Sequence, residues 1–377
     1  MQRSTERILT THVGSLPRPP RLEAMLLRRE KGEVELQDRE RLPGLVVDAV
    51  SAVVRRQAEL GIDIVGDGEM SKYAYATYAR ERISGLDGED QPLALSELAE
   101  FPNFAQRIRL DIKTPACVAP VSYQGEAALA ADIGNLKAAL GAVEVEAAFM
   151  SASSPGIMAH YMPNRHYPSQ DAYLEALAEA MKHEYDAIAG AGLLLQIDCP
   201  DLALGRHFRS APLSVGEFRS EVARLVEVLN HALRDIPAER MRLHLCWGNY
   251  ESPHHHDIEL KEILDLILKV RPAALLIEAA NPRHEHEWTV FKETKLPDDK
   301  VLVPGVIDTC TNYVEHPEVV AQHLERYAGV VGRERVIAGT DCGFASFATL
   351  HTVDPDIAWR KLEALVQGAE LASRRLW

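Results

Sequence analysis

Four residues with metal-binding side chains stand where the sequence predicts the ends of buried strands. His244 and Cys246 lie two positions apart in an apolar run, and a strand with a period of two points both side chains to the same face. Glu278 ends the next apolar run, and Cys342 follows the last one. One nitrogen, two sulfurs and one carboxylate oxygen form a tetrahedral donor set that suits Zn2+. An isolated His-x-Cys pair also occurs as plain buried packing, so the spacing alone leaves both interpretations open.

Short apolar runs of strand length alternate with amphipathic stretches along the chain, which predicts repeated βα units around a parallel sheet. The strand candidates are 8–13, 62–66, 117–123, 147–153, 193–198, 242–247, 274–279, 301–307 and 336–340. The helix candidates are 44–60, 169–190, 215–234, 257–269, 316–328 and 356–373, with Ser214 and Asp257 as capping residues. The expected fold is therefore a single (βα)8 TIM barrel over residues 1–377, although there is one strand candidate too many.

Residues 80–116 interrupt this alternation with mixed charge, Gly and Pro, and we expect them to form an excursion from the barrel that includes a hairpin. In such barrels the active site lies at the carboxyl ends of the strands. Those ends carry further residues that could bind a substrate or take part in a reaction. They are Gly14, Ser15, Asp67, Glu69, Asp198, Cys199, Asp308 and Asp341. The pattern predicts that these side chains converge at one rim of the barrel.

The composition of the chain excludes several kinds of partner. Its 41 Lys and Arg against 56 Asp and Glu give a formal charge of −15, whereas nucleic acids and anionic membranes are bound by clustered basic side chains. No apolar stretch has the length of a signal peptide or of a membrane span, so we expect a cytoplasmic protein. Five widely spaced cysteines, an odd number, form a poor disulfide framework and favour thiol or metal chemistry.

Seven short motifs resemble, in order, those of the cobalamin-independent methionine synthase family. They are TTHVGSLPRP (10–19), DGEM (67–70), IDCP (197–200), HLCWGN (244–249), LLIEAAN (275–281), GVID (305–308) and TDCGF (340–344). They are similar to the catalytic barrel of that family and span nearly the whole chain. The resemblance implies a (βα)8 barrel with a catalytic zinc, which activates homocysteine for methylation by a methyl-folate.

The resemblance also implies roles for individual residues. The zinc ligands would be His244, Cys246, Glu278 and Cys342. Gly14 and Ser15 would bind the carboxylate of homocysteine, and Glu69 and Asp198 would bind its ammonium group. This division agrees with the charges, because a zwitterionic amino acid needs donors at one end and acceptors at the other.

The expected mechanism is transfer of a methyl group to a thiolate. A free thiol has a pKa near 8.5, and coordination to Zn2+ deprotonates it at neutral pH. The half of the site that binds the methyl donor departs from the family: Thr309 and Cys310 stand where the family carries a histidine acid, and Tyr161 stands where a tryptophan stacks on the pterin. The donor is therefore either a methyl-folate or a methyl-corrinoid protein.

Other functions compete with a zinc-dependent thiol S-methyltransferase. The second enzyme class is an epoxide-thiol transferase of the 2-hydroxypropyl-coenzyme M lyase type, whose anionic thiol would need a basic clamp from Arg18, Lys72, Arg165 and Arg206. A structural zinc site would leave Glu69 and Asp198 without a role. A metal-dependent hydrolase usually assembles several histidines around a metal-bound water, which fits this sulfur-rich set poorly.

Several further residues have plain structural interpretations. Cys117, Cys199 and Cys310 are expected to be packing residues, His254–His256 a solvated loop, and His284–Glu287 part of the surface. Asp67, Asp308 and Asp341 either orient site residues or cap helices. Tyr73, Tyr75 and Tyr78 either line the pocket or pack an entry helix.

Overall fold

Eight parallel strands form a closed barrel in the computed structural model, which describes residues 2–33, 35–92, 95–108, 113–349 and 351–377. Six of them form one parallel sheet in the order β2, β5, β6, β7, β8, β9, and β1 pairs with β10. Single bridges close the ring, Thr11 with Ile64 between β1 and β2, and Leu302 with Val336 between β9 and β10. The strands are β1 (Leu9–Thr10), β2 (Ile64–Gly66), β5 (Ala147–Ser153), β6 (Leu194–Asp198), β7 (Met241–His244), β8 (Ala274–Glu278), β9 (Val301–Gly305) and β10 (Ile337–Ala338).

The barrel confirms the expected fold class and all but one of the strand candidates. The exception is 117–123, which makes only isolated bridges, Cys117 with Asn164 and Tyr123 with Ile83. Pro120 lies in the middle of this run and has no N–H for a sheet ladder. The extra strand candidate was therefore wrong.

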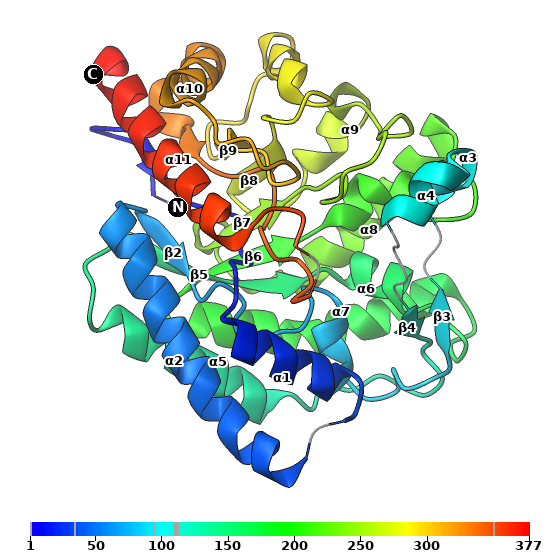
Figure 1. The fold of residues 1–377 in the computed structure, drawn as a ribbon. Helices are drawn as coiled ribbons and strands as arrows, with labels where there is room; N and C mark the ends of the chain where they lie inside the picture. The colour runs from blue at the N-terminus through cyan, green and yellow to red at the C-terminus, as the bar shows by residue number, and fades with distance from the viewer. Residues whose placement is uncertain (1, 34, 93–94, 109–112, 350) are drawn as a thin grey trace.

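Helices surround the barrel (Figure 1). They are α1 (Pro20–Glu30), α2 (Leu36–Leu60), α5 (Glu126–Leu140), α6 (Pro155–Tyr161), α7 (Gln170–Gly190), α8 (Val215–Ala232), α9 (Leu260–Ile267), α10 (Pro317–Val331) and α11 (Pro355–Leu376). Short 3-10 helices are η1 (Thr77–Glu81), η2 (Pro200–Leu202), η3 (Leu204–Arg206), η4 (Ala238–Arg240), η5 (Glu285–Lys292) and η6 (Arg333–Arg335). The six predicted helices are present, and most of their ends lie within a few residues of the predicted ones.

The two predicted caps have different outcomes. Ser214 caps α8 in a full capping box, in which its side chain accepts from the Glu217 N–H and the Glu217 side chain accepts from the Ser214 N–H. Asp257 does not cap α9, which begins at Leu260. The Asp257 carboxylate instead forms buried ion pairs with His254 and His284.

The expected excursion and its hairpin are confirmed. β3 (Asp90–Pro92) pairs antiparallel with β4 (Lys113–Pro115), and α3 (Ser96–Glu100) and α4 (Pro102–Ile108) lie between them. Residues 93–94 and 109–112 of the predicted excursion lie outside the described part of the chain. The Glu97 carboxylate fixes α3 to the loop after β7, because it accepts hydrogen bonds from Tyr250 and Ser252, both at 2.6 Å.

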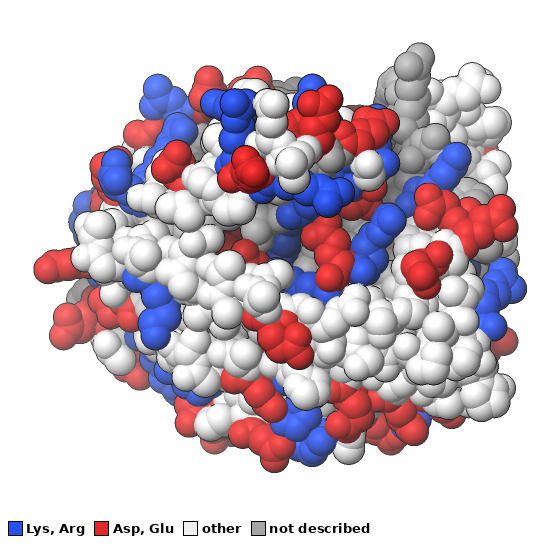
Figure 2. Space-filling view, turned by 90° about the horizontal axis from the view of Figure 1, so that it is seen from below, with Lys and Arg blue, Asp and Glu red and all other residues white. Residues whose placement is uncertain are grey.

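The strands bury apolar residues on both faces, as expected for parallel strands covered by helices. One cluster fills the barrel, and it consists of Leu9, Val13, Ile64, Phe149, Leu194, Ala274, Leu276, Val301, Val303 and Ile337. Among the described residues, no helix combines the length and the apolar character that crossing a membrane requires. Figure 2 shows one face of the molecule, on which acidic and basic side chains are intermixed around a hollow.

Candidate functional site

A cluster of three buried side chains lies at the carboxyl ends of β7 and β10. His244 ends β7, Cys246 follows it by two residues, and Cys342 follows β10. Their potential ligand atoms all lie within 4.8 Å of one another. The two Sγ atoms are 3.9 Å apart, and both cysteines are free thiols rather than a disulfide. The barrel thus brings three of the four predicted metal ligands together.

The hydrogen bonds of His244 suit a metal ligand. Its Nδ1 lies 3.2 Å from Asp198 Oδ1, and because a carboxylate only accepts, Nδ1 carries the proton. The other ring nitrogen, Nε2, is buried without a hydrogen-bond partner. An imidazole that donates from one nitrogen to a carboxylate and leaves the second nitrogen free has the arrangement seen in zinc-ligating histidines.

The cluster pairs a thiolate with an imidazolium, and a metal ion would take the place of the imidazolium proton on Nε2. The hydrogen bond from Cys246 lowers the pKa of the Cys342 thiol to about 5, although burial acts in the opposite direction. Burial disfavours a charge on His244, but the Cys342 thiolate and Asp198 raise the pKa of His244 to about 10. Two sulfurs, one of them a thiolate, beside an imidazole are a donor set that fits Zn2+.

Glu278 lies near this cluster but is held by other partners. Its Oε1 accepts from the Trp247 N–H at 2.7 Å, and its Oε2 accepts from Asn281 Nδ2 at 2.8 Å. Its carboxylate is not part of the three-residue group. Burial raises the pKa of Glu278, whereas the charge on His284 opposes that shift. The assignment of Glu278 as a fourth ligand stays a prediction.

Asp341 orients the loop that carries Glu278. One of its carboxylate oxygens accepts from the Ala279 N–H at 2.7 Å, and the other accepts from the Asn281 N–H at 2.9 Å. Asn281 in turn donates to Glu278. Asp308 plays a different part, because its carboxylate accepts from the N–H of Cys310 within its own turn.

We expect Asp341→Asn to weaken metal binding about 10–100-fold, the usual cost of losing a group that positions a ligand. The amide nitrogen of asparagine cannot accept the Asn281 hydrogen bonds, so Glu278 would lose its orientation. Metal affinity is measured by competition with a chelator, and thermal unfolding checks the fold. The matched control is Asp308→Asn, which should leave affinity unchanged. Equal affinity in all three proteins would contradict a ligand role for Glu278.

A cavity of about 380 Å³ opens beside the cysteine cluster at the same end of the barrel. Its wall includes Ser15, Glu69, Tyr161 and Asp198, which the sequence singled out as substrate-binding residues. Gly14 lies directly behind, where a Cβ atom would come within 2.7 Å of Glu69 Oε1. A side chain at position 14 would therefore displace the Glu69 carboxylate.

Glu69 is presented to the cavity in an unusual backbone conformation. Its φ of 57° is left-handed, and Asp67 Oδ1 stabilises this turn by accepting from the Glu69 N–H at 2.9 Å. Ser151 Oγ donates to Glu69 Oε1 at 2.7 Å, whereas Oε2 is buried without a partner. Burial raises the pKa of this carboxyl, and Lys72 opposes the shift. An unpartnered buried carboxylate oxygen indicates that a donor from a ligand is expected there.

Aromatic side chains form the opposite part of the cavity wall. The Tyr75 and Tyr161 hydroxyls are 3.1 Å apart, and the Tyr161 ring lies 5.1 Å from that of Phe208. Of the three tyrosines after Glu69, only Tyr75 lines the cavity; Tyr78 is buried and donates to Glu184. The sequence analysis missed several lining residues, among them Phe208, Asn249, Tyr250 and Phe347. Asn249 could have been found, since it belongs to the HLCWGN motif. The others lie on loops, where no motif or periodicity in the sequence marks them as cavity residues.

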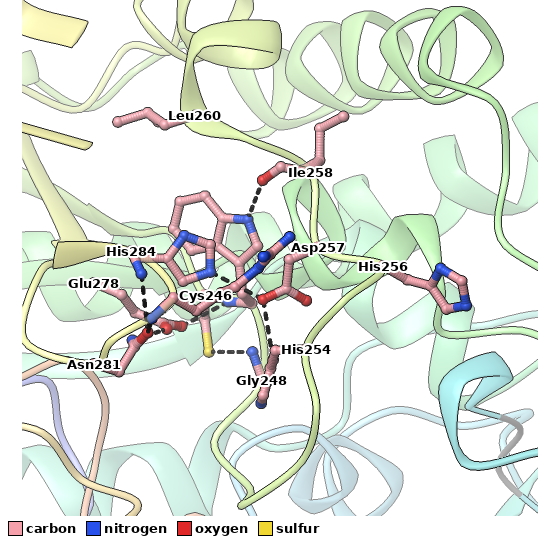
Figure 3. A network of polar contacts seen from close by, with 12 residues as sticks. Cys246, Gly248, His254, His256, Asp257, Ile258, Leu260, Glu278, Asn281 and His284 are labelled. Atoms are coloured by element: carbon pink, nitrogen blue, oxygen red, sulfur yellow. Dashed lines mark hydrogen bonds and ion pairs between the residues drawn. The ribbon is translucent and has the colours of Figure 1, made fainter. Parts of the chain in front are cut away.

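A buried ion-pair network around Asp257 lies beside Glu278 (Figure 3). Asp257 Oδ2 contacts His254 Nδ1 at 3.0 Å and His284 Nε2 at 2.9 Å, and the Trp247 ring packs on His284. Burial disfavours charged imidazoles, but hydrogen bonds with Asp257 raise the pKa of His254 to about 9 and that of His284 to about 10. The network supports the two loops that carry Cys246 and Glu278.

This network corrects two structural expectations. His284 and Glu287 were expected at the surface, but both are buried, and they contact each other at 3.0 Å. His254 was expected in a solvated loop, and it is largely buried because Asp257 and the Tyr250 carbonyl bind its two nitrogens. A run of charged residues does not indicate which of its side chains are buried. That depends on ion-pair partners from other segments, which only the folded structure shows.

Comparison with known proteins gives a consistent picture. A family model described as the catalytic domain of cobalamin-independent synthase matches residues 8–370. The chain is 27% identical to a methionine synthase of Thermococcus kodakarensis, over 97% of this chain and 94% of that protein. It is 25% identical to a methionine synthase of Saccharolobus solfataricus, over 97% and 95%. Its fold is similar to a B12-independent methionine synthase from Shewanella sp. W3-18-1, with a TM-score of 0.75, 21% identity and coverage of 98% and 99%.

Proposed function

The chain belongs to the cobalamin-independent methionine synthase family, and on this premise we propose that it transfers a methyl group to the sulfur of homocysteine and forms methionine. The observation that carries the proposal is the cavity itself. A sulfur-rich metal-binding cluster and two acidic side chains, Glu69 and Asp198, line the same 380 Å³ space. A small thiol with an ammonium group matches both features.

The proposed zinc ligands are His244, Cys246 and Cys342, with Glu278 as the fourth. Zn2+ bound there would lower the pKa of a thiol so that it is a thiolate at neutral pH. Asp198 holds the proton on His244 Nδ1 and thereby keeps Nε2 available as a donor of its lone pair.

The proposed substrate-binding groups then orient the amino acid. Glu69 Oε2, which has no partner of its own, would accept from the ammonium group together with Asp198. Ser15, with the adjoining backbone of Gly14, would bind the carboxylate. The aromatic wall around Tyr75 and Tyr161 would exclude water from the sulfur and receive the methyl donor.

The charges of the cavity do not favour the coenzyme M alternative. Among the described residues that line the cavity, none is Lys or Arg. Arg18 donates to the Glu69 and Ala345 carbonyls, and Lys72 donates to the Ser151 carbonyl. Arg206 donates to the carbonyl of Leu213. A sulfonate would face the carboxylates of Glu69, Asp198 and Glu251 without a basic clamp, whereas an ammonium group would be attracted by them.

We expect Asp198→Asn and Glu69→Gln each to weaken homocysteine binding about tenfold or more while the metal remains bound, because the amide oxygen of asparagine can still accept the hydrogen bond from His244 Nδ1. Each change removes a charge-assisted hydrogen bond to the ammonium group, which is worth roughly 1.5–3 kcal/mol. Titration calorimetry measures the affinity. The control ligand is 4-mercaptobutanoate, which lacks the amino group and should bind both variants about as well as the unmodified protein. Unchanged homocysteine binding in both variants would instead favour a thiol without an amino group.

The decisive test of the function is product formation. Zinc-loaded protein is incubated with homocysteine and, separately, with a methyl-folate or methylcobalamin, and methionine is followed by mass. Methionine from either donor supports the proposal. Absence of methionine with both donors, together with absence of homocysteine binding, would contradict it.

A further inference from the structure

Three metal-binding side chains outside the cysteine cluster converge at the surface near the cavity mouth. His255 Nε2 lies 3.0 Å from one carboxylate oxygen of Glu100, and His256 Nε2 contacts the other. The ligand atoms of all three lie within 4.8 Å of one another. The side chains are partly exposed, with fractions of 50% for Glu100, 34% for His255 and 20% for His256, so an ion from solvent can reach them.

Adjacent residues normally point apart, and the local backbone explains why these two histidines do not. His254 has a left-handed φ of 52°, and this conformation is held by Asp257 at 3.0 Å and by the Tyr250 carbonyl at 2.9 Å. After this turn the rings of His255 and His256 lie 4.0 Å apart at 36°. Figure 3 shows that His256 points away from the network around Cys246.

We propose that Glu100, His255 and His256 form a second metal site, for a divalent first-row transition ion such as Zn2+, Co2+ or Ni2+. Two imidazole nitrogens and one carboxylate oxygen are donors that these ions prefer, and the remaining coordination positions stay open to water. Binding replaces any protons shared between the imidazoles and the carboxylate, and no redox step is involved.

The position of this site gives it a structural consequence. Glu100 ends α3 in the excursion, whereas His255 and His256 belong to the loop that starts after β7. Residues at both sides of this contact, Leu95 and Tyr250, line the cavity. An ion bound between them therefore fastens α3 to the loop after β7 and stabilises that part of the cavity wall.

The test is titration of untagged protein with Co2+, because cobalt reports its ligands by absorption. We expect about two equivalents per chain. One gives the thiolate-to-metal charge-transfer band of the cysteine cluster, and the other gives only the weaker bands of nitrogen and oxygen ligands. The double variant His255→Ala/His256→Ala and the single variant Glu100→Gln should lose the second equivalent and keep the thiolate band.

The matched control is His231→Ala, which removes an exposed histidine that pairs with one carboxylate, Glu179, at 2.6 Å. This variant should retain both equivalents. A single equivalent in the unmodified protein, or a second equivalent that survives in both the double variant and Glu100→Gln, would overturn the proposal. Because the thiolate band is followed separately, failure of the second site is distinguishable from failure of the proposed zinc site.

Amide hydrogen exchange tests the structural consequence. Exchange in residues 95–101 should slow when the second equivalent of Co2+ is added to the unmodified protein, and it should not change in the double variant. Equal exchange in the two proteins would refute the fastening of α3, even if the ion binds.

Discussion

Replacing Cys246 or Cys342 by serine is expected to remove most of the bound zinc and to reduce methyl transfer about 10³-fold or more. A hydroxyl is a poor substitute for a thiolate ligand. Lewis-acid activation by a metal is worth several kcal/mol, and each ~1.4 kcal/mol is a factor of ten in rate. The fold should survive the change at Cys246, because a serine oxygen can still accept the hydrogen bond that Gly248 donates to Sγ at 3.3 Å. Metal analysis and methionine formation measure the two effects.

The matched control is Cys117→Ser. Cys117 is also a buried free thiol, but its Sγ contacts the Ala119 carbonyl, and it belongs to neither the cysteine cluster nor the cavity wall. This variant should retain zinc and activity. If Cys246→Ser and Cys342→Ser both kept full zinc, the cysteine cluster would be excluded as the metal site.

The sequence predicted the barrel because its strands are buried on both faces and read as nearly continuous apolar runs. It failed at 117–123, where Pro120 and the neighbouring excursion prevent a sheet ladder. It also predicted which residues converge, since strand ends meet at one rim of a closed barrel. His244, Cys246 and Cys342 lie together for this reason.

The parts of the site that were not predictable depend on tertiary partners rather than on local pattern. Asp257 has the residue type of a helix cap, yet two buried imidazoles bind its carboxylate. Phe208 and Tyr250 reach the cavity from loops, whose course no periodicity indicates. The hydrogen bonds that Trp247 and Asn281 donate to the two Glu278 oxygens were equally inaccessible from the sequence.

The part of the site that would receive the methyl donor differs from the part that would bind the thiol, which is acidic and rich in sulfur. Tyr161 and Tyr75 supply a hydrogen-bonded aromatic wall. Thr309 and Cys310 follow Asp308, where the resemblance of the motifs implies a histidine acid; neither residue lines the cavity, but Asn249 beside them does. Both of these side chains contact Asn249 Oδ1, at 2.8 Å from Thr309 Oγ1 and 3.4 Å from Cys310 Sγ. Burial raises the pKa of the Cys310 thiol well above its usual value, so the thiol is a poor proton donor.

Methyl-folate is therefore expected to be a poor methyl donor for this protein, and methylcobalamin is expected to react faster. Departure of the folate requires protonation of its nitrogen, whereas departure of the corrinoid does not. Cys310→His should restore an acid next to Asn249, and it should raise methyl-folate turnover by up to ~10²–10⁴-fold, the usual contribution of general acid catalysis. Turnover with methylcobalamin should change little, and the ratio of the two rates is the measurement.

Two further variants test whether the missing acid at position 310 limits the use of methyl-folate. Cys310→Ser matches the size of the thiol without adding an acid, so it should leave methyl-folate turnover low. His351 also lines the cavity, but its Nε2 is paired with Glu23 at 2.9 Å, and His351→Gln should therefore have little effect on either donor. Rapid methyl-folate turnover by the unmodified protein would refute the argument, and its loss in His351→Gln would identify His351 as the acid that takes the place of the family's histidine.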